Sequence, residues 1–209
     1  MRKKLLLAIA MVVFGLASHA QVEKGNCLLG GTLGISTSNS NNAGIIGSGS
    51  NSNFTPEFGL AVAKNSILGI RTDIYVSTSK DDAGDKYTNG DYSVGAFWKK
   101  FLPVNEKAGW FIDLGAGYTY EKNTYTYTVP NTVNQDSHGS GAYLTFSPGV
   151  FYKPTKKILL DAEVGGLTYN YSKNIFNNGA SDKTSAFNLN LLNYFTFGVS
   201  FILGKDHQG

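Results

Sequence analysis

Seven ionisable side chains recur on one face of the alternating segments of this chain, and such groups can pair, conduct ions or form a gate. These residues are Glu57, Arg71, Asp73, Lys99, Asp113, Asp161 and Glu163. Five carboxylates against two cations leave an acidic excess if all seven share one interior. Buried charges must pair or hold water, because removing an ion from water is costly. The two interpretations are an ion pathway, in which Arg71 and Lys99 switch among carboxylates, and a salt-bridged plug.

Nucleophilic catalysis requires a hydroxyl or thiol within reach of a histidine base. Beyond residue 20 the sequence contains only His138 and His207. Asp136, Ser137 and His138 are neighbours in sequence, whereas catalytic triads are assembled by geometry from separate positions. Cys27 is the single cysteine and cannot form an internal disulfide, so we expect a small, partly buried thiol near the start of the first strand. No residue spacing indicates a metal site, and we expect neither an enzyme nor a cofactor.

Eight segments in which polar and apolar residues alternate must position these side chains. Their predicted bounds are 26–37, 53–64, 67–79, 90–102, 109–121, 140–153, 157–171 and 186–203. Short connections at 64–66, 103–108 and 154–156 alternate with longer polar ones at 38–52, 80–89, 122–139 and 172–185. An alternation of period two predicts β-strands. The regular order of short and long connections places all short turns at one end of an antiparallel sheet.

The apolar face of these strands is predicted to face lipid, although a soluble barrel with an apolar interior has the same period. The step from Trp110 to Tyr120 covers about 33 Å along a strand. At a tilt of roughly 40° this projects to about 25 Å, the apolar height of a membrane barrel. The opposite face is rich in glycine and carries few charges, unlike a soluble surface. The sequence therefore predicts an all-β, eight-stranded, antiparallel up-and-down transmembrane β-barrel.

Aromatic residues at both ends of the apolar face predict two girdles at the membrane interfaces. They are Tyr92, Trp98, Trp110, Tyr118, Tyr120 and Tyr152. The lumen of such a barrel is only wide enough for side chains, so we favour the salt-bridged plug and expect Arg71 to pair with a carboxylate. Tyr169 and Tyr171 fall on the wrong face of a regular strand, and 191–193 breaks the alternation. We expect a β-bulge or a rim position at each place.

The first 20 residues have a basic start, an apolar run and small residues before Gln21, which predicts a cleavable signal peptide at 1–20. The remaining residues, 21–209, are expected to form one outer-membrane barrel domain with a tail at 204–209. Removing residues 1–20 removes three of the 18 cationic residues and none of the 15 acidic ones. The remaining charge is balanced, so we expect no nucleic acid partner.

Several motifs resemble those of a known family. Pro56-Glu57-Phe58-Gly59, the turn Lys64-Asn65-Ser66 and Leu68-Gly69-Ile70 lie on the second and third segments. Thr196, Gly198, Phe201 and Leu203 are similar to the terminal signal read by the barrel assembly machinery, although Leu203 stands where an aromatic is usual and six residues follow it. The chain resembles the small OmpA- or OmpX-like outer-membrane barrels, especially the outer membrane protein beta-barrel domain proteins of Bacteroidota.

This resemblance implies an integral outer-membrane location with long loops outside the cell and both termini in the periplasm. The implied partners are outer-membrane lipid and lipopolysaccharide, the assembly machinery, and a surface ligand or an envelope protein. Aromatics among Thr and Asn at 124–129 and 171–176 suit protein or glycan contact, although the Tyr/Thr alternation at 124–129 favours a strand extension. We expect a non-enzymatic structural or surface-interaction barrel. A narrow porin-like channel is the alternative, and a lipid-modifying enzyme the third.

Overall fold

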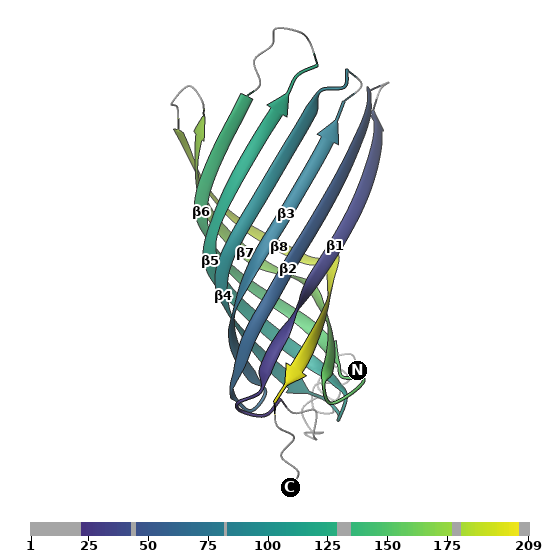
Figure 1. The fold of residues 1–209 in the computed structure, drawn as a ribbon, viewed down its shortest axis with the longest axis vertical. Helices are drawn as coiled ribbons and strands as arrows, with labels where there is room; N and C mark the ends of the chain where they lie inside the picture. Colours follow the sequence, from purple (N-terminus) through teal and green to yellow (C-terminus); the bar gives the residue numbers. More distant parts are fainter. Residues whose placement is uncertain (1–21, 43–44, 82, 129–134, 177–180, 205–209) are drawn as a thin grey trace, which may run out of the picture.

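Alternating polar and apolar residues build the whole structure. The computed structural model describes residues 22–42, 45–81, 83–128, 135–176 and 181–204. Its strands are β1 (Cys27–Asn42), β2 (Ile45–Ala63), β3 (Ser66–Lys80), β4 (Lys86–Pro103), β5 (Ala108–Thr126), β6 (Gln135–Tyr152), β7 (Ile158–Phe176) and β8 (Ser181–Leu203). They form a closed antiparallel barrel in chain order (Figure 1). The predicted fold class is confirmed. The predicted signal peptide lies outside the described residues.

The predicted long connections are wrong in extent, because the strands continue far beyond the apolar band. β1 pairs with β2 as far as Asn42 and Ile45, and β5 continues to Thr126 as the Tyr/Thr alternation predicted. His138, expected in a loop, lies in β6. In these extensions polar side chains bond across strands: the Tyr87 hydroxyl donates to Asn123 Oδ1 at 2.7 Å. The polar composition of these strand ends therefore led to a wrong prediction of loops.

The expected irregularities are present where β7 meets β8. The register of this pair shifts between Glu163 and Gly165, and Gly165 has a positive φ of 84°. The shift brings Tyr169 and Tyr171 to the outer surface, where both are exposed. The same shift places Leu191 opposite Gly165, in the region where β8 was expected to break its alternation. The bulge thus reverses which residues of the upper half of β7 point inward and which point outward.

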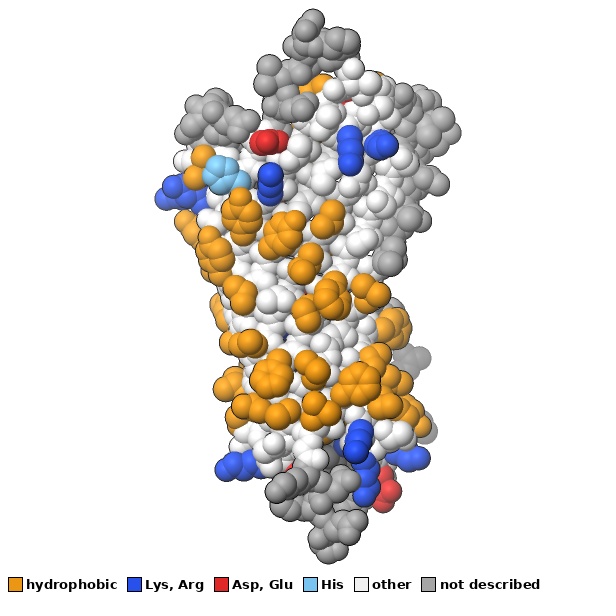
Figure 2. Space-filling view, viewed as in Figure 1, with side chains coloured by type: hydrophobic (Ala, Val, Ile, Leu, Met, Phe, Trp, Pro, Cys, Tyr) orange, Lys and Arg blue, Asp and Glu red, His pale blue; other side chains and the backbone are white. Residues whose placement is uncertain are grey.

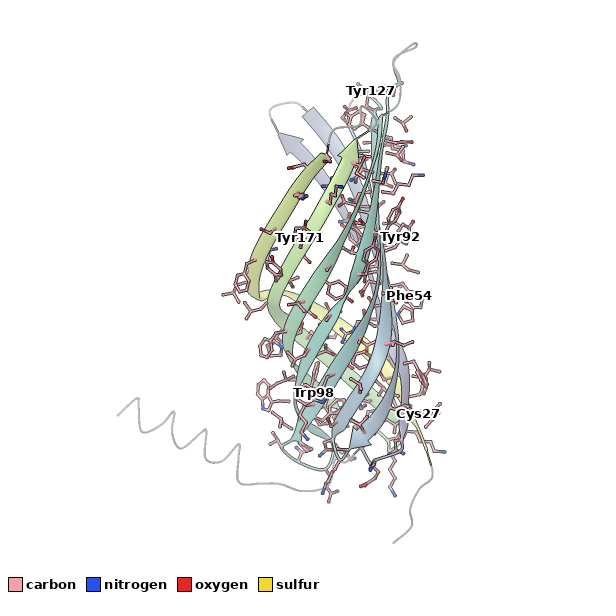
Figure 3. The ribbon with its side chains drawn as sticks, turned by 90° about the vertical axis from the view of Figure 1, so that its left-hand side faces the viewer. Cys27, Phe54, Tyr92, Trp98, Tyr127 and Tyr171 are labelled. Atoms are coloured by element: carbon pink, nitrogen blue, oxygen red, sulfur yellow. The ribbon has the colours of Figure 1, made fainter. Side chains whose placement is uncertain are left out.

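On the face shown in Figure 2, hydrophobic side chains form two belts on the outer surface, one near the short-turn end and one above it. The six predicted girdle residues are all exposed on this surface. Figure 3 shows Trp98 near the short-turn end, Tyr92 and Tyr171 higher, and Phe54 between them. No helix in the described part of the chain is long and apolar enough to cross a membrane.

An apolar layer fills the barrel at the short-turn end. Its buried members are Val22, Leu28, Ala61, Ile67, Phe97, Phe101, Phe111, Phe151, Leu159 and Ile202. The Phe101 ring contacts those of Phe111 and Phe151 at centroid distances of 6.1 and 5.1 Å. The amide of Val22 donates to Asn65 Oδ1 at 2.9 Å, which ties the segment before β1 to the β2–β3 turn. Cys27 is a half-buried free thiol at the start of β1, as expected.

Candidate functional site

Five of the seven predicted inward charges meet directly above the apolar layer. We call Glu57, Arg71, Lys99, Asp113 and Asp161 the ion-pair cluster. They come from β2, β3, β4, β5 and β7, because inward residues of neighbouring strands lie opposite one another. Glu57 faces Arg71 across β2 and β3, and Lys99 faces Asp113 across β4 and β5. The barrel closure thus joins charges that are up to 104 positions apart in the sequence.

Arg71 bridges two carboxylates. Its Nη2 donates to Asp113 Oδ1 at 2.5 Å, and its Nη1 lies 3.6 Å from Glu57 Oε1. The side chains of these two acids are almost fully buried, and that of Arg71 is 12% exposed. A guanidinium can contact two acids at once because its donors form a planar fork. Arg71 therefore pairs with two of the inward carboxylates.

Lys99 is the centre of the cluster. Its Nζ donates to Glu57 Oε2 at 3.3 Å and lies 3.7 Å from Asp113 Oδ2 and 3.9 Å from Asp161 Oδ2. The residue is only 2% exposed. An unpaired ammonium ion at this depth would be strongly unfavourable, so three carboxylates around one amine stabilise its charge.

The floor of the cluster is aromatic, which the sequence reasoning missed. The Arg71 guanidinium carbon lies 4.6 Å from the centroid of the Phe97 ring, and Lys99 Nζ lies 5.1 Å from that of Phe111. Cations are attracted to ring faces at such distances. The sequence pattern could have predicted this floor. Phe97, Phe111 and Phe151 lie near the short turns and, by the alternation of the strands, point to the same inward face as Lys99 and Asp113. The cluster and its floor form one continuous plug.

Glycines make room for the rings of the plug. A Cβ at Gly149 would collide with the Phe111 ring and with the carbonyl of Ala162. A Cβ at Gly69 would lie 2.6 Å from the Phe97 ring. The small residues of the inward face therefore hold aromatic side chains that span the lumen. They do not leave it empty.

Asp73 and Glu163 lie outside the network of ion pairs. Asp73 Oδ2 accepts a hydrogen bond from the Ser93 hydroxyl at 2.5 Å, one layer above the cluster. Glu163 is half-buried and close enough to Arg71 and Lys99 to interact electrostatically with both. The cluster alone has three carboxylates and two cations, so the acidic excess expected from the sequence is present in the structure.

Above the plug, the inward face is polar and half-exposed. Ser77 donates to Asn51 Oδ1 at 2.7 Å, and Asn123 Nδ2 donates to Glu121 Oε1 at 2.6 Å. We call the inward-facing upper part of the barrel that carries Asn51, Asp73, Ser77, Ser93 and Asn123 the vestibule. Its residues are only partly covered, unlike those of the plug. The lumen is thus filled at the short-turn end and lined by partly exposed polar side chains above it.

The residues considered for catalysis and metal binding do not come together in the described part of the chain. Asp136, Ser137 and His138 lie consecutively on β6, so Ser137 points to the face opposite that of the other two. These three side chains cannot form a catalytic triad with one another. The described part of the chain contains no group of three or more His, Cys, Asp or Glu residues arranged to hold a metal ion. His207 lies outside the described residues.

Three of the four residues of the predicted assembly signal, Gly198, Phe201 and Leu203, lie in the ladder that closes the barrel. Gly198 is inward, and a Cβ there would collide with the Asp161 carboxylate. Phe201 and Leu203 are exposed on the outer surface and pair with Leu29 and Cys27 of β1. Thr196 lies opposite Glu163 of β7. The last strand therefore contacts both the first strand and the ion-pair cluster.

An eight-stranded barrel with an apolar exterior and aromatic belts is an integral outer-membrane β-barrel. The chain belongs to the family described as outer membrane protein beta-barrel domain, whose pattern matches residues 6–195. The family resemblance expected from the sequence is confirmed, and the protein is located in the outer membrane. No curated protein matches the chain.

Two solved structures are similar in fold. The translocator domain of the autotransporter NalP from Neisseria meningitidis has a TM-score of 0.49 and 14% identity. The match covers 90% of this chain and 65% of that one, so the chain spans less than two thirds of that structure. A major outer membrane protein from Thermus thermophilus has a TM-score of 0.42 and 14% identity, with 87% of this chain and 100% of that one covered.

Proposed function

We propose that this protein is a non-enzymatic structural or surface-interaction barrel whose lumen is plugged by its own side chains. The observation that carries the proposal is the burial of the plug: Lys99 is 2% exposed, and Asp113, Phe97 and Phe111 are each 1% exposed. In eight-stranded barrels the interior is filled by side chains. A filled lumen leaves the outer surface and the hairpins as the places where the protein meets partners.

The orientation we propose places the short turns in the periplasm and the long hairpins outside the cell. Short turns on the periplasmic side and longer extracellular connections are the rule in bacterial barrels. β1 begins and β8 ends at the short-turn end in Figure 1, so the chain would enter and leave the barrel on the periplasmic side. The aromatic pair Tyr125 and Tyr127, with ring centroids 4.5 Å apart, would then lie at the cell surface and be available to a ligand or an envelope protein.

Lipopolysaccharide is the lipid partner we propose for the upper rim. Five exposed lysines lie near the tips of the strands: Lys80, Lys86, Lys122, Lys173 and Lys183. Figure 2 shows blue side chains of Lys or Arg above the upper hydrophobic belt. Lys80 faces Lys86, and Lys173 faces Lys183, directly across strand pairs. Like charges in such positions repel one another. Anionic phosphate groups of the outer leaflet would relieve this repulsion.

The barrel assembly machinery remains the proposed partner during insertion, through Thr196, Gly198, Phe201 and Leu203. These residues lie on the strand that closes the barrel. A narrow porin-like channel for ions or small solutes is the competing function, and the excess of carboxylates over cations in the cluster would favour cations in it. The tight plug favours the closed barrel over that channel.

Thiol labelling in intact cells tests the proposed orientation and the side on which the vestibule opens. In a Cys27→Ser background, Ala83→Cys marks the β3–β4 connection, Ser77→Cys the vestibule and Glu106→Cys a short turn. We expect a membrane-impermeant maleimide to label Ala83→Cys and Ser77→Cys but not Glu106→Cys until the cells are lysed. Labelling of Glu106→Cys alone in intact cells would reverse the orientation, and an unreactive Ser77→Cys would mean that the vestibule is closed to the exterior.

A further inference from the structure

The first and last strands of the barrel pair over only a short stretch. The described ladder between β1 and β8 joins Cys27–Thr32 to Gly198–Leu203. Above it, within the described residues, 33–42 of β1 pair only with β2, and 181–191 of β8 pair only with β7. Figure 1 shows the upper part of β8 diverging from β1. We call this opening the β1–β8 seam.

The seam begins at the depth of the hydrocarbon core. Leu33, the first residue of β1 beyond the ladder with β8, lies opposite Phe54 of β2. In Figure 3, Phe54 lies between the heights of Trp98 and Tyr92, which belong to the lower and upper aromatic girdles. Leu33 and Phe197, on the two sides of the seam, are 68% and 69% exposed. Two open strand edges therefore face the bilayer interior.

Open edges cannot remain unpaired at that depth. Their N–H and C=O groups find no water in the hydrocarbon core, and each unsatisfied group costs several kcal/mol. Lipid tails offer no hydrogen-bonding groups. The occupant of the seam must therefore be polypeptide in an extended conformation.

The sequence of the β1 edge also favours pairing. Residues 33–42 contain no charged residue and no proline. Charges and prolines are the usual devices that keep edge strands from pairing with another chain. On β8, Asp182 and Lys183 lie only at the far tip of the open edge. Neither edge is protected at membrane depth.

The direction of the strands limits what can fill the seam. β1 and β8 run antiparallel to each other. If every strand inserted between them is also antiparallel to its neighbours, the number of inserted strands must be even. A second copy related by a twofold axis along the membrane normal supplies two, its own β8 against β1 and its own β1 against β8. A hollow of about 480 Å³ at the base of the seam, lined by Gly31, Phe54, Phe197 and their neighbours, is placed to receive apolar side chains of that copy.

We propose that two copies of this chain pair edge to edge through the β1–β8 seam and form a dimer in the outer membrane. In this dimer the backbone groups of residues 33–42 are satisfied by β8 of the second copy. The plug lies below the seam and is unaffected, so the dimer is independent of whether the lumen conducts.

Cross-linking between single-cysteine variants tests this dimer. Leu33→Cys and Leu189→Cys, each in a Cys27→Ser background and carrying different tags, are folded together in lipid bilayers at low protein density. Each molecule then has one thiol, so a short bis-maleimide can join only separate molecules. We expect a covalent species of twice the monomer mass that contains both tags. Heat-modifiable gel mobility of each variant verifies that it has folded.

The matched control is Leu114→Cys, which is exposed on β5 away from the seam. Two differently tagged Leu114→Cys proteins should stay monomeric under the same conditions. Equal cross-linking of the Leu114→Cys control and the seam pair would overturn the proposal, because it would reflect random collision. So would a purely monomeric seam pair, or native membranes in which Leu33→Cys is joined only to a different protein.

Discussion

Lys99 shows how a single residue can decide whether the interior of this barrel is stable. Its ammonium group lies between three carboxylates and above the Phe111 ring. Arg71 contacts two of the same acids, Glu57 and Asp113. Removing either cation would leave carboxylates buried without a sufficient partner. The cluster therefore stabilises the barrel only when every charge is paired. A buried charge network that is only partly paired is less favourable than an apolar core in the same place.

Arg71→Ala is expected to lower the free energy of unfolding by about 3 to 5 kcal/mol, the usual cost of removing one partner of a buried ion pair. Glu57 and Asp113 lose one of their cations in this variant. The measurement is the urea midpoint of the barrel in lipid vesicles, followed by tryptophan fluorescence. Lys122→Ala, which removes an exposed lysine, is the control and should unfold with the wild type. An unchanged midpoint for Arg71→Ala would mean that Arg71 does not support the plug.

Two inward glycines are expected to respond differently to the same substitution. Gly149→Ala drives a Cβ into the Phe111 ring and the Ala162 carbonyl, whereas Gly115→Ala meets only the movable Thr145 hydroxyl within close range. Overpacking of this kind costs about 1 to 3 kcal/mol. Gly149→Ala should therefore lower the urea midpoint, and Gly115→Ala should change it little. Equal effects of the two substitutions would contradict the ring packing described for Phe111.

At the scale of the strands, alternation alone predicted eight elements and the inward position of every charge in the cluster. Apart from the extension of β5, the upper ends of the strands were missed, because Ser, Thr and Asn are typical of both loops and water-exposed strands. Only the cross-strand register reveals which they are. The aromatic floor was missed for another reason: Phe97 and Phe111 lie inward, where a polar face was expected. Neighbouring glycines such as Gly149 make room for these rings, but which ring fills which gap depends on three-dimensional packing.

Gly165 is the element-scale position most sensitive to substitution, because its positive φ forms the bulge that brings Tyr169 and Tyr171 to the lipid face. Gly165→Val should destabilise the barrel by about 1 to 2 kcal/mol, since β-branched residues tolerate this conformation poorly. Gly165→Asn is the matched variant and should lose less stability than Gly165→Val, because Asn adopts left-handed backbone geometry more readily. Equal urea midpoints for the two variants would show that the bulge does not require this backbone conformation.

The whole molecule is asymmetric along its axis. Its short-turn half is closed by pairing of all eight strands and filled by the plug, whereas its upper half holds a polar vestibule beside the β1–β8 seam. The sequence could not predict this asymmetry. The alternation in the lower halves of β1 and β8 does not record which strand each of them pairs with, and their pairing joins residues at opposite ends of the chain. The filling of the lumen and the separation of β1 from β8 thus depend on three-dimensional packing, which no local sequence pattern predicts.

Single-channel conductance of the refolded barrel, residues 21–209, tests the central claim most directly. The wild type, verified as folded by gel mobility, should give no discrete conductance in a planar bilayer, because Lys99, Asp113 and the phenylalanine floor fill the lumen. Phe97→Ala/Lys99→Ala removes the centre of the plug and, where it folds, should give discrete openings. Stable wild-type openings whose ion selectivity changes with Arg71→Ala would contradict the plug and make the cluster the selectivity filter of a channel.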